Sequence, residues 1–316
     1  MPKNCTGWQK FLTKNATAAV ATDILSSIES KSDKANFLGY SHPFSSAWLS
    51  AMTTNDSKIK NDVFLEALGT RCGVPTTSEA HACRCSADST KTISPSTALQ
   101  HAHSSSNEAK SGQDSRHESI KWIFTNEMRT IVGLNNVVAE KAGQHVADKS
   151  GYMTRLEKNG NFNKNATDPS SYLCADLFVK LGDLNLALDV NISFPGGANN
   201  GPSRMGEDYG VTRGSVADQN SILKQEKYAK LYDFDPKFFA PITFETNGCP
   251  GASTVAFLST VKQWVRKNGS SIQKKSIGTC IRRLTIKTSV SLASSLGSAI
   301  LAYRKVCQKG AGRVGA

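Results

Sequence analysis

The sequence lacks the features that mark a secreted or membrane-spanning protein. Its start, MPKNCTGWQK, has no continuous apolar run of the kind that forms the centre of a signal peptide. The longest apolar candidate for a membrane helix, Leu284–Tyr303, contains Lys287 and many serines, which make it a poor spanning segment. We therefore expect an intracellular protein that has no membrane anchor.

Closely spaced cysteines are also scarce, and no internal repeat is visible. The chain has eight cysteines, but only Cys83 and Cys85 lie near one another in the sequence. In a reducing compartment such cysteines are expected to be free core thiols or metal ligands. A disulfide-stapled scaffold and a repeat array are therefore not expected.

What the chain does have is size, apolar content and positive charge. Its 316 residues, 39% of them apolar, can fold into one large domain or two ordinary ones. The 38 basic and 26 acidic residues give a formal net charge of +12. This balance favours a polyanionic partner, either nucleic acid or an anionic membrane surface, over an acidic protein substrate.

Helical periodicity dominates both ends of the chain. The first 70 residues carry apolar side chains at three-and-four spacing, and a helix is expected over Asp62–Leu68, closing at Gly69. Residues 70–115 are rich in Ser, Thr and His and have little apolar periodicity. A further helix is predicted from His117, with Gly133 as its stop, and two more are predicted from Ala252 onward. The helix predicted from His117 shows the spacing Ile120, Phe124, Met128, Ile131.

The centre of the chain predicts strands. A short one is expected in NNVVAEK, ending at Glu140, and two more in LCADLFVKLGDLNLALDVNI (173–192), joined across Gly182 and Asp183. Alternation in the second of these strands puts Asp189 and Asn191 on one face. A mobile loop over Pro195–Ser215 and a strand over Phe238–Thr246 complete this region.

Between that loop and the last strand, a helix is predicted over about Ala217–Tyr232. It is expected to bury Ile222 and Leu223 in part, together with Ala229 and Leu231. Lys224 and Lys227 lie one turn apart on it.

Two strand aspartates that converge on one point repel each other unless a cation lies between them. Oxygen ligands of this kind suit Mg²⁺ or Mn²⁺, which bind phosphodiesters and activate water. A lysine from the 217–232 helix would stabilise the charge of a phosphoryl transition state, and Glu140 would add an acidic ligand. On spacing alone, the same aspartates also fit turn-forming or solvated positions.

The order of several segments resembles a known family. They are similar to the region downstream of the polymerase in non-LTR retrotransposons that carry a restriction-endonuclease-like domain. The segments are SSAWLSAM (45–52), FLEALGTRCGVP (64–75), CRC (83–85), QHAHSS (100–105), RHESI (116–120), VVAEK (137–141), CADLFV (174–179), LALDVNI (186–192), KQEKYAKL (224–231) and PITFETNG (241–248).

This resemblance implies a zinc knuckle followed by a nuclease of the PD-(D/E)xK type, which cuts the strand whose 3′ end primes reverse transcription. In the nuclease, Asp176 matches the aspartate of the PD motif and Asp189 the second acid. Glu140 matches the upstream acid. The matches that remain are Lys227-Tyr228, to the lysine and tyrosine of the downstream helix, and Arg116-His117, to an Arg-His pair.

The chain departs from the family pattern at three positions. Ala175 replaces the proline before the first aspartate, and Asn191 replaces the lysine of (D/E)xK, a role that Lys224 or Lys227 could take from the helix. In the knuckle, the first three zinc ligands match, but Ser105 holds the fourth position and is a poor ligand, for which Cys72, His81 or His103 could substitute. The three matching residues are Cys83, Cys85 and His101.

Other readings stay open for several of these residues. His117 either caps its helix or contacts phosphate or the active site. Tyr228 either packs in a buried helix face or contacts nucleic acid. The basic residues of the C-terminal region either follow a DNA backbone or form a solvated face. They are Lys262, Arg266, Lys267, Lys274, Lys275, Arg282 and Arg283.

We thus expect an α/β protein with a restriction-endonuclease-like mixed central sheet flanked by helices. The expected parts are a helical N-terminal region (1–69), a degenerate zinc-knuckle-like segment and linker (70–115), the nuclease domain (116–250) and a basic helical extension (251–316). The expected function is Mg²⁺- or Mn²⁺-dependent nicking of DNA, with Zn²⁺ in the knuckle.

The alternative is a catalytically inactive remnant that binds nucleic acid. The expected partners are DNA, or RNA, and a reverse transcriptase, because no polymerase motif is recognisable in the chain. The expected location is the nucleus.

Overall fold

The computed structural model describes most of the helical and sheet-forming parts of the chain. Its described residues are 5–50, 58–72, 81–82, 92–93, 107–139, 154–155, 175–195, 209–229, 232–233 and 236–311. The helices are α1 (Cys5–Ser27), α2 (Lys31–Tyr40), α3 (Pro43–Ser50), α4 (Asn61–Arg71), α6 (Asn107–Val132), α9 (Ser215–Ala229), α10 (Ala252–Asn268) and α11 (Ser271–Ala311).

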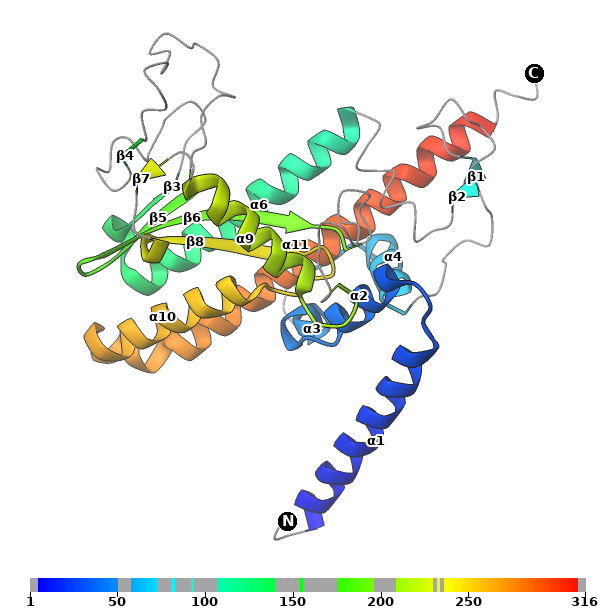
Figure 1. The fold of residues 1–316 in the computed structure, drawn as a ribbon, viewed down its shortest axis with the longest axis horizontal. Coiled ribbons are helices and arrows are strands. Elements are labelled where there is room, and N and C mark those ends of the chain that lie inside the picture. The colour runs from blue at the N-terminus through cyan, green and yellow to red at the C-terminus, as the bar shows by residue number, and fades with distance from the viewer. Residues whose placement is uncertain are drawn as a thin grey trace.

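The main sheet has four strands in the order β3-β5-β6-β8 (Figure 1). They are β3 (Val137–Ala139), β5 (Leu177–Leu181), β6 (Leu184–Ser193) and β8 (Phe239–Glu245), and the two-residue strands β1 (His81–Ala82), β2 (Thr92–Ile93), β4 (Thr154–Arg155) and β7 (Tyr232–Asp233) pair apart from it. β5 is antiparallel to β3 and β6, whereas β8 runs parallel to β6. The predicted mixed α/β architecture with a helix-flanked sheet is therefore confirmed.

The two strands predicted around Gly182 and Asp183 form a tight hairpin. Leu181 pairs with Leu184, so only two residues make the turn, and Gly182 has a φ of 65°. Two-residue hairpins need positive φ at the first turn position, which glycine adopts without strain. This turn fixes the register of β5 and β6, on which the candidate site depends.

Helix α6 covers one face of the sheet. Its apolar stripe packs with the inward residues Leu186, Leu188 and Val190 of β6 in one buried cluster. The stripe consists of Ile120, Phe124, Met128 and Ile131. The sequence predicted this stripe and the stop at Gly133, whose φ is 100°. The predicted start at His117 was wrong, because the helix already begins at Asn107, within the segment expected to be a linker.

Helix α9 covers the opposite face (Figure 1). Its sheet-facing positions follow the spacing i, i+4, i+7 and i+11: Ala217, Ser221, Lys224 and Tyr228. Ser221 Oγ lies 2.7 Å from Thr243 Oγ1, and the Tyr228 ring stacks on Phe239 with centroids 4.2 Å apart. The prediction that Ile222 is partly buried was wrong: 46% of its surface is exposed, and helix α9 ends at Ala229 rather than Tyr232.

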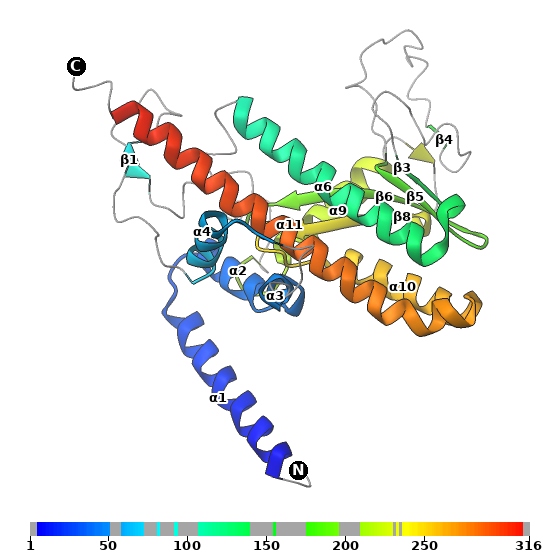
Figure 2. The ribbon, with the colours of Figure 1, turned by 180° about the vertical axis from the view of Figure 1, so that it is seen from behind.

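The C-terminal helices and the N-terminal region share the core of the sheet. Phe44 of α3, Phe257 and Val261 of α10, and Leu284 and Leu292 of α11 belong to the same buried cluster as the α6 stripe. Figure 2 shows α11 running past α10, α6 and the N-terminal helices. Residues of the N-terminal region, of the central part that carries the sheet and of the C-terminal extension therefore share one hydrophobic core.

Helix α11 has the length and composition that membrane-crossing helices share. Residues Ser271–Ala302 meet both criteria, as core helices of soluble proteins also do. In the structure, 44% of the most apolar window is buried inside the protein. The buried carboxylate of Glu127 on α6 ties α11 in place through Arg283 at 2.7 Å and Lys287 at 2.9 Å.

Candidate metal site

The strand pairing of β5 and β6 brings two aspartates together. Leu177 pairs with Leu188, so continuing the register by one residue places Asp176 opposite Asp189. Because strand side chains alternate, Asp189 points to the α9 face while Leu188 and Val190 point to the core. Both carboxylates are buried, with 5% and 4% of the residue exposed.

At the start of β5, the Asp176 carboxylate accepts a hydrogen bond from a backbone amide of β6, a place that a backbone carbonyl would take in a continued strand pair. Asp176 lies just before β5, and its Oδ2 accepts hydrogen bonds from the Val190 amide at 2.7 Å and from His117 Nε2 at 3.0 Å. Burial alone would raise the pKa of Asp176, but these hydrogen bonds and the charge of His117 outweigh burial and hold it below the usual range. Asp176 is therefore the more acidic member of the pair.

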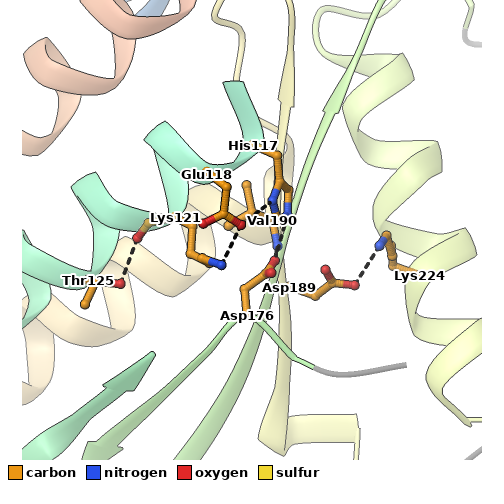
Figure 3. Close-up of polar contacts among 8 residues, drawn as sticks. All are labelled: His117, Glu118, Lys121, Thr125, Asp176, Asp189, Val190 and Lys224. Atoms are coloured by element: carbon orange, nitrogen blue, oxygen red, sulfur yellow. Dashed lines mark hydrogen bonds and ion pairs between the residues drawn. The ribbon is translucent and has the colours of Figure 1, made fainter. Parts of the chain in front are cut away.

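Asp189 is held differently. Burial is the main reason that its pKa rises to about 6, and the neighbouring Asp176 carboxylate raises it further. The ammonium group of Lys224 opposes this rise from 2.7 Å (Figure 3). Two buried carboxylates side by side are costly without nearby cations, so this pair favours the binding of positive charge.

Helix α6 supplies a further line of charged groups (Figure 3). The hydrogen bond to Asp176 raises the pKa of His117, against the opposing effect of burial. Glu118 Oε1 lies 3.6 Å from His117 Nδ1 and 2.6 Å from Lys121 Nζ. His117 is thus held between an acid of the hairpin and an acid of its own helix, which fixes the orientation of its ring.

Three of these groups could hold a metal ion. The ligand atoms of His117, Asp176 and Asp189 all lie within 4.8 Å of one another, and in the described part of the chain they are the one group of this kind. Two carboxylates and an imidazole are ligands that divalent cations such as Mg²⁺, Mn²⁺ and Zn²⁺ accept. The burial of both acids and the raised pKa of Asp189 agree with a place for such a cation.

The structure places one of the two lysines proposed for this site beside Asp189. Lys224 lies on the sheet-facing stripe of α9 and contacts Asp189. Lys227 lies three residues further, where its side chain is exposed to solvent. The adjacent Tyr228 is fully buried against Phe239. Tyr228 therefore packs in a buried helix face, as the first of its two interpretations expects.

Arg116 and His117 occupy different environments although they are adjacent. His117 faces Asp176, as an active-site contact requires. Arg116 is 6% exposed, and burial lowers its pKa to about 10. A direct contact of Arg116 with nucleic acid would require this side chain to leave its buried position.

Glu245, at the end of β8, belongs to a separate group. It is fully buried and accepts hydrogen bonds from the Val216 amide at 3.3 Å and from Asn247 Nδ2 at 2.9 Å. Burial is the main cause that raises its pKa to about 7. The Val216 contact places the carboxyl group at the N-terminus of α9, where it caps the helix.

Several expected ligands lie outside the described residues. They are Glu140, Cys83, Cys85 and His101. Glu140 follows directly after β3, the strand next to β5. The upstream acid of the nuclease and the zinc knuckle therefore stay predictions from the sequence.

Sequence reasoning missed Glu118 and Lys121. A signal was present, since HESIK (117–121) in a helix places His117 and Lys121 one turn apart on one face. The amide of Val190 gave no signal, because a backbone donor is the same at every residue.

Comparisons with family models, with curated proteins and with solved structures found no match for this chain.

Proposed function

We propose that this protein is a metal-dependent DNA endonuclease of the PD-(D/E)xK type, of retrotransposon origin. One observation carries the proposal: two acids of the β5–β6 hairpin, Asp176 just before β5 and Asp189 in β6, come together with a lysine from the following helix at one buried point. Asp176, Asp189 and Lys224 make up this arrangement, with His117 beside it. The mixed sheet with helices on both faces agrees with a restriction-endonuclease-like fold.

The residues of the site suit hydrolysis of a phosphodiester. Asp176 and Asp189, with His117, would hold Mg²⁺ or Mn²⁺. Such a cation supplies charge neutralisation and activates water. Lys224 stands beside Asp189 and would stabilise the additional negative charge on the phosphoryl oxygens. Water adds to phosphorus, and the bond to the 3′ oxygen breaks, leaving a 3′ hydroxyl that a reverse transcriptase can extend.

Lys224 could also replace the strand lysine that is missing at Asn191. In the family pattern a lysine stands at this strand position, two residues after the second acid. Here Asn191 is partly buried and accepts a weak hydrogen bond from Ser193 Oγ at 3.4 Å. A lysine from α9 reaches the second acid from the helix side, so the positive charge is supplied by a different element.

Nicking of supercoiled plasmid tests the proposal. The wild-type protein is expected to convert supercoiled to open-circular DNA with Mg²⁺ or Mn²⁺ and to be inactive in EDTA. Asp176→Ala and Asp189→Asn should abolish nicking, because each removes a carboxylate charge from the site. Equal nicking by wild type and Asp176→Ala would remove these carboxylates from the mechanism.

A second function, a catalytically inactive module that binds nucleic acid, is favoured by the loss of the strand lysine at Asn191. It predicts salt-sensitive DNA binding without cleavage in any divalent metal. Metal-dependent nicking that is lost in Asp189→Asn would rule it out. Under either function, nuclear DNA is the partner that we propose.

A further inference from the structure

The net positive charge of this protein arises in its C-terminal part. Residues 246–316 contain 12 Lys and Arg residues and no Asp or Glu. The 245 residues before them contain 26 basic and 26 acidic residues, so the entire net charge of +12 arises after β8. Such segregation is typical of surfaces that bind polyanions.

Six of these cations lie on the α10–α11 hairpin, five of them exposed and Lys262 half-buried. None of the six forms an ion pair with an acid among the described residues, because the available acids lie elsewhere. Two more, Arg283 and Lys287, share the single carboxylate of Glu127. The six are Lys262, Arg266, Lys267, Lys274, Lys275 and Arg282.

The apolar side of this hairpin is already used inside the protein. Ile277, Cys280 and Leu284 of α11 are buried in the main core, which leaves charged and small polar side chains on the outside. Two large apolar residues are exposed on the hairpin, Ile272 in the first turn of α11 and Val255 in the first turn of α10. A helix that binds a lipid surface needs a free apolar face. The hairpin therefore suits a polyanion bound by charge, such as nucleic acid.

Gly278 indicates a binding site independently of the charge distribution. It lies in the interior of α11 and is exposed, and a Cβ added there would meet nothing within 4 Å. Glycine destabilises a helix interior relative to alanine, and no contact in the described protein requires it here. Lys274 precedes it by four residues and Arg282 follows it by four, so all three lie on neighbouring turns of one side.

We infer that the backbone of duplex DNA binds the α10–α11 hairpin, with a phosphate approaching the α11 main chain closely at Gly278. Lys274 and Arg282 are eight positions apart, which is about 12 Å along a helix. Duplex DNA presents a negative charge about every 1.7 Å along its axis, so several phosphates can be contacted across this span. This inference rests on the proposed function only in the choice of DNA as the polyanion.

Gly278→Ala separates binding from folding. The added methyl group meets no atom of the protein, so the melting temperature should stay the same or rise. Affinity for a 30-base-pair DNA duplex, measured by fluorescence anisotropy in EDTA, should fall by about threefold or more. Unchanged affinity together with unchanged or raised stability would overturn the close approach at Gly278.

The triple variant Lys274→Gln, Lys275→Gln, Arg282→Gln tests the charges. The slope of log affinity against log salt should fall in magnitude by about 2 to 3, since each lost phosphate contact removes about 0.9. The matched control, Lys58→Gln with Lys60→Gln, removes two exposed cations near α4 and should leave the slope unchanged. Equal slopes for wild type and the triple variant would overturn the proposal, as would absence of DNA binding by wild type.

Anionic vesicles of phosphatidylserine and phosphatidylcholine form the second arm. Loss of vesicle binding in the triple variant, with DNA binding unchanged, would assign the surface to a membrane and overturn the DNA proposal. All binding is measured without metal, so these results do not depend on cleavage. DNA binding through the hairpin by a protein that never nicks would keep this inference and reject the nuclease.

Discussion

At the scale of single residues, helical geometry places two lysines of α9 in different environments, one facing the sheet and one exposed to solvent. Lys224 lies seven residues after Ala217 and four before Tyr228, on the stripe that faces the sheet. Lys227 lies about 60° away from Lys224 around the helix and is exposed. The hairpin aspartates could be predicted from the alternation of β6, but the choice between the lysines depended on which side of α9 packs.

This geometry predicts different effects of two similar substitutions. Lys224→Gln should lower the rate of Mg²⁺-dependent plasmid nicking by about 10²- to 10³-fold, because it removes charge stabilisation at Asp189. Lys227→Gln is the matched control and should leave the rate within about twofold. Equal losses in both variants, measured at one DNA concentration above saturation, would contradict the role given to Lys224.

Glu245 gives a prediction about pH and stability. Its pKa is raised from 4.5 to about 7 in the folded protein, so the folded state holds this proton more tightly than the unfolded state. The stabilisation is complete below about pH 4.5 and is lost as the pH rises through 7. Its loss should lower the free energy of unfolding by about 3 kcal/mol.

Glu245→Gln cannot titrate and isolates this effect. Urea unfolding at pH 5 and pH 8 should show that the stability of wild type relative to the variant falls between the two values. Parallel pH profiles would show that the carboxyl group of Glu245 does not titrate in this range.

At the scale of elements, strands and helices could be predicted better than their faces. The strands around Gly182 and Asp183 follow a clear period of two, and α6 follows a clear apolar stripe, so both were expected. The face of α9 that packs on the sheet was not expected from the sequence. Its sheet-facing stripe is small or polar at Ala217, Ser221 and Lys224, because the sheet opposite offers Thr243 and Asp189 instead of aliphatic side chains. Complementarity of this kind arises from tertiary contacts that local periodicity does not contain.

The ion cluster between α6 and α11 gives a prediction at this scale. The Glu127 side chain is 3% exposed, whereas those of Arg283 and Lys287 are 43% and 44% exposed. The double variant Arg283→Gln, Lys287→Gln leaves a buried carboxylate without cations and should cost about 3 kcal/mol in unfolding free energy. Glu127→Gln leaves cations that can reach water and should cost about 1 kcal/mol. A larger loss in Glu127→Gln, measured by urea unfolding at pH 7, would contradict this.

At the scale of the whole molecule, the parts of the chain converge on one core. The buried cluster beneath the sheet contains residues as far apart in the sequence as Phe44 and Leu292. The sequence suggested separate segments, because composition changes sharply between them while contacts between distant segments leave no local pattern. The site accordingly draws on α6, the β5–β6 hairpin and α9, which only the complete fold brings together.

A shared core predicts cooperative unfolding. Urea transitions followed by tryptophan fluorescence and by far-ultraviolet circular dichroism should coincide. Leu284→Ala, at a fully buried position of α11, should lower the unfolding free energy by about 2 to 5 kcal/mol and shift both transitions together. Two separated transitions, with only one shifted by Leu284→Ala, would indicate that α11 and the sheet fold independently.

The proposed nuclease requires Asp176 and Asp189 to share a divalent cation. Anomalous diffraction from crystals of the protein soaked with Mn²⁺ measures this directly. We expect a Mn²⁺ peak within about 2.5 Å of an oxygen of each carboxylate, and no such peak in crystals of Asp189→Asn. Well-ordered carboxylates without Mn²⁺ between them, at saturating metal and neutral pH, would contradict the proposal.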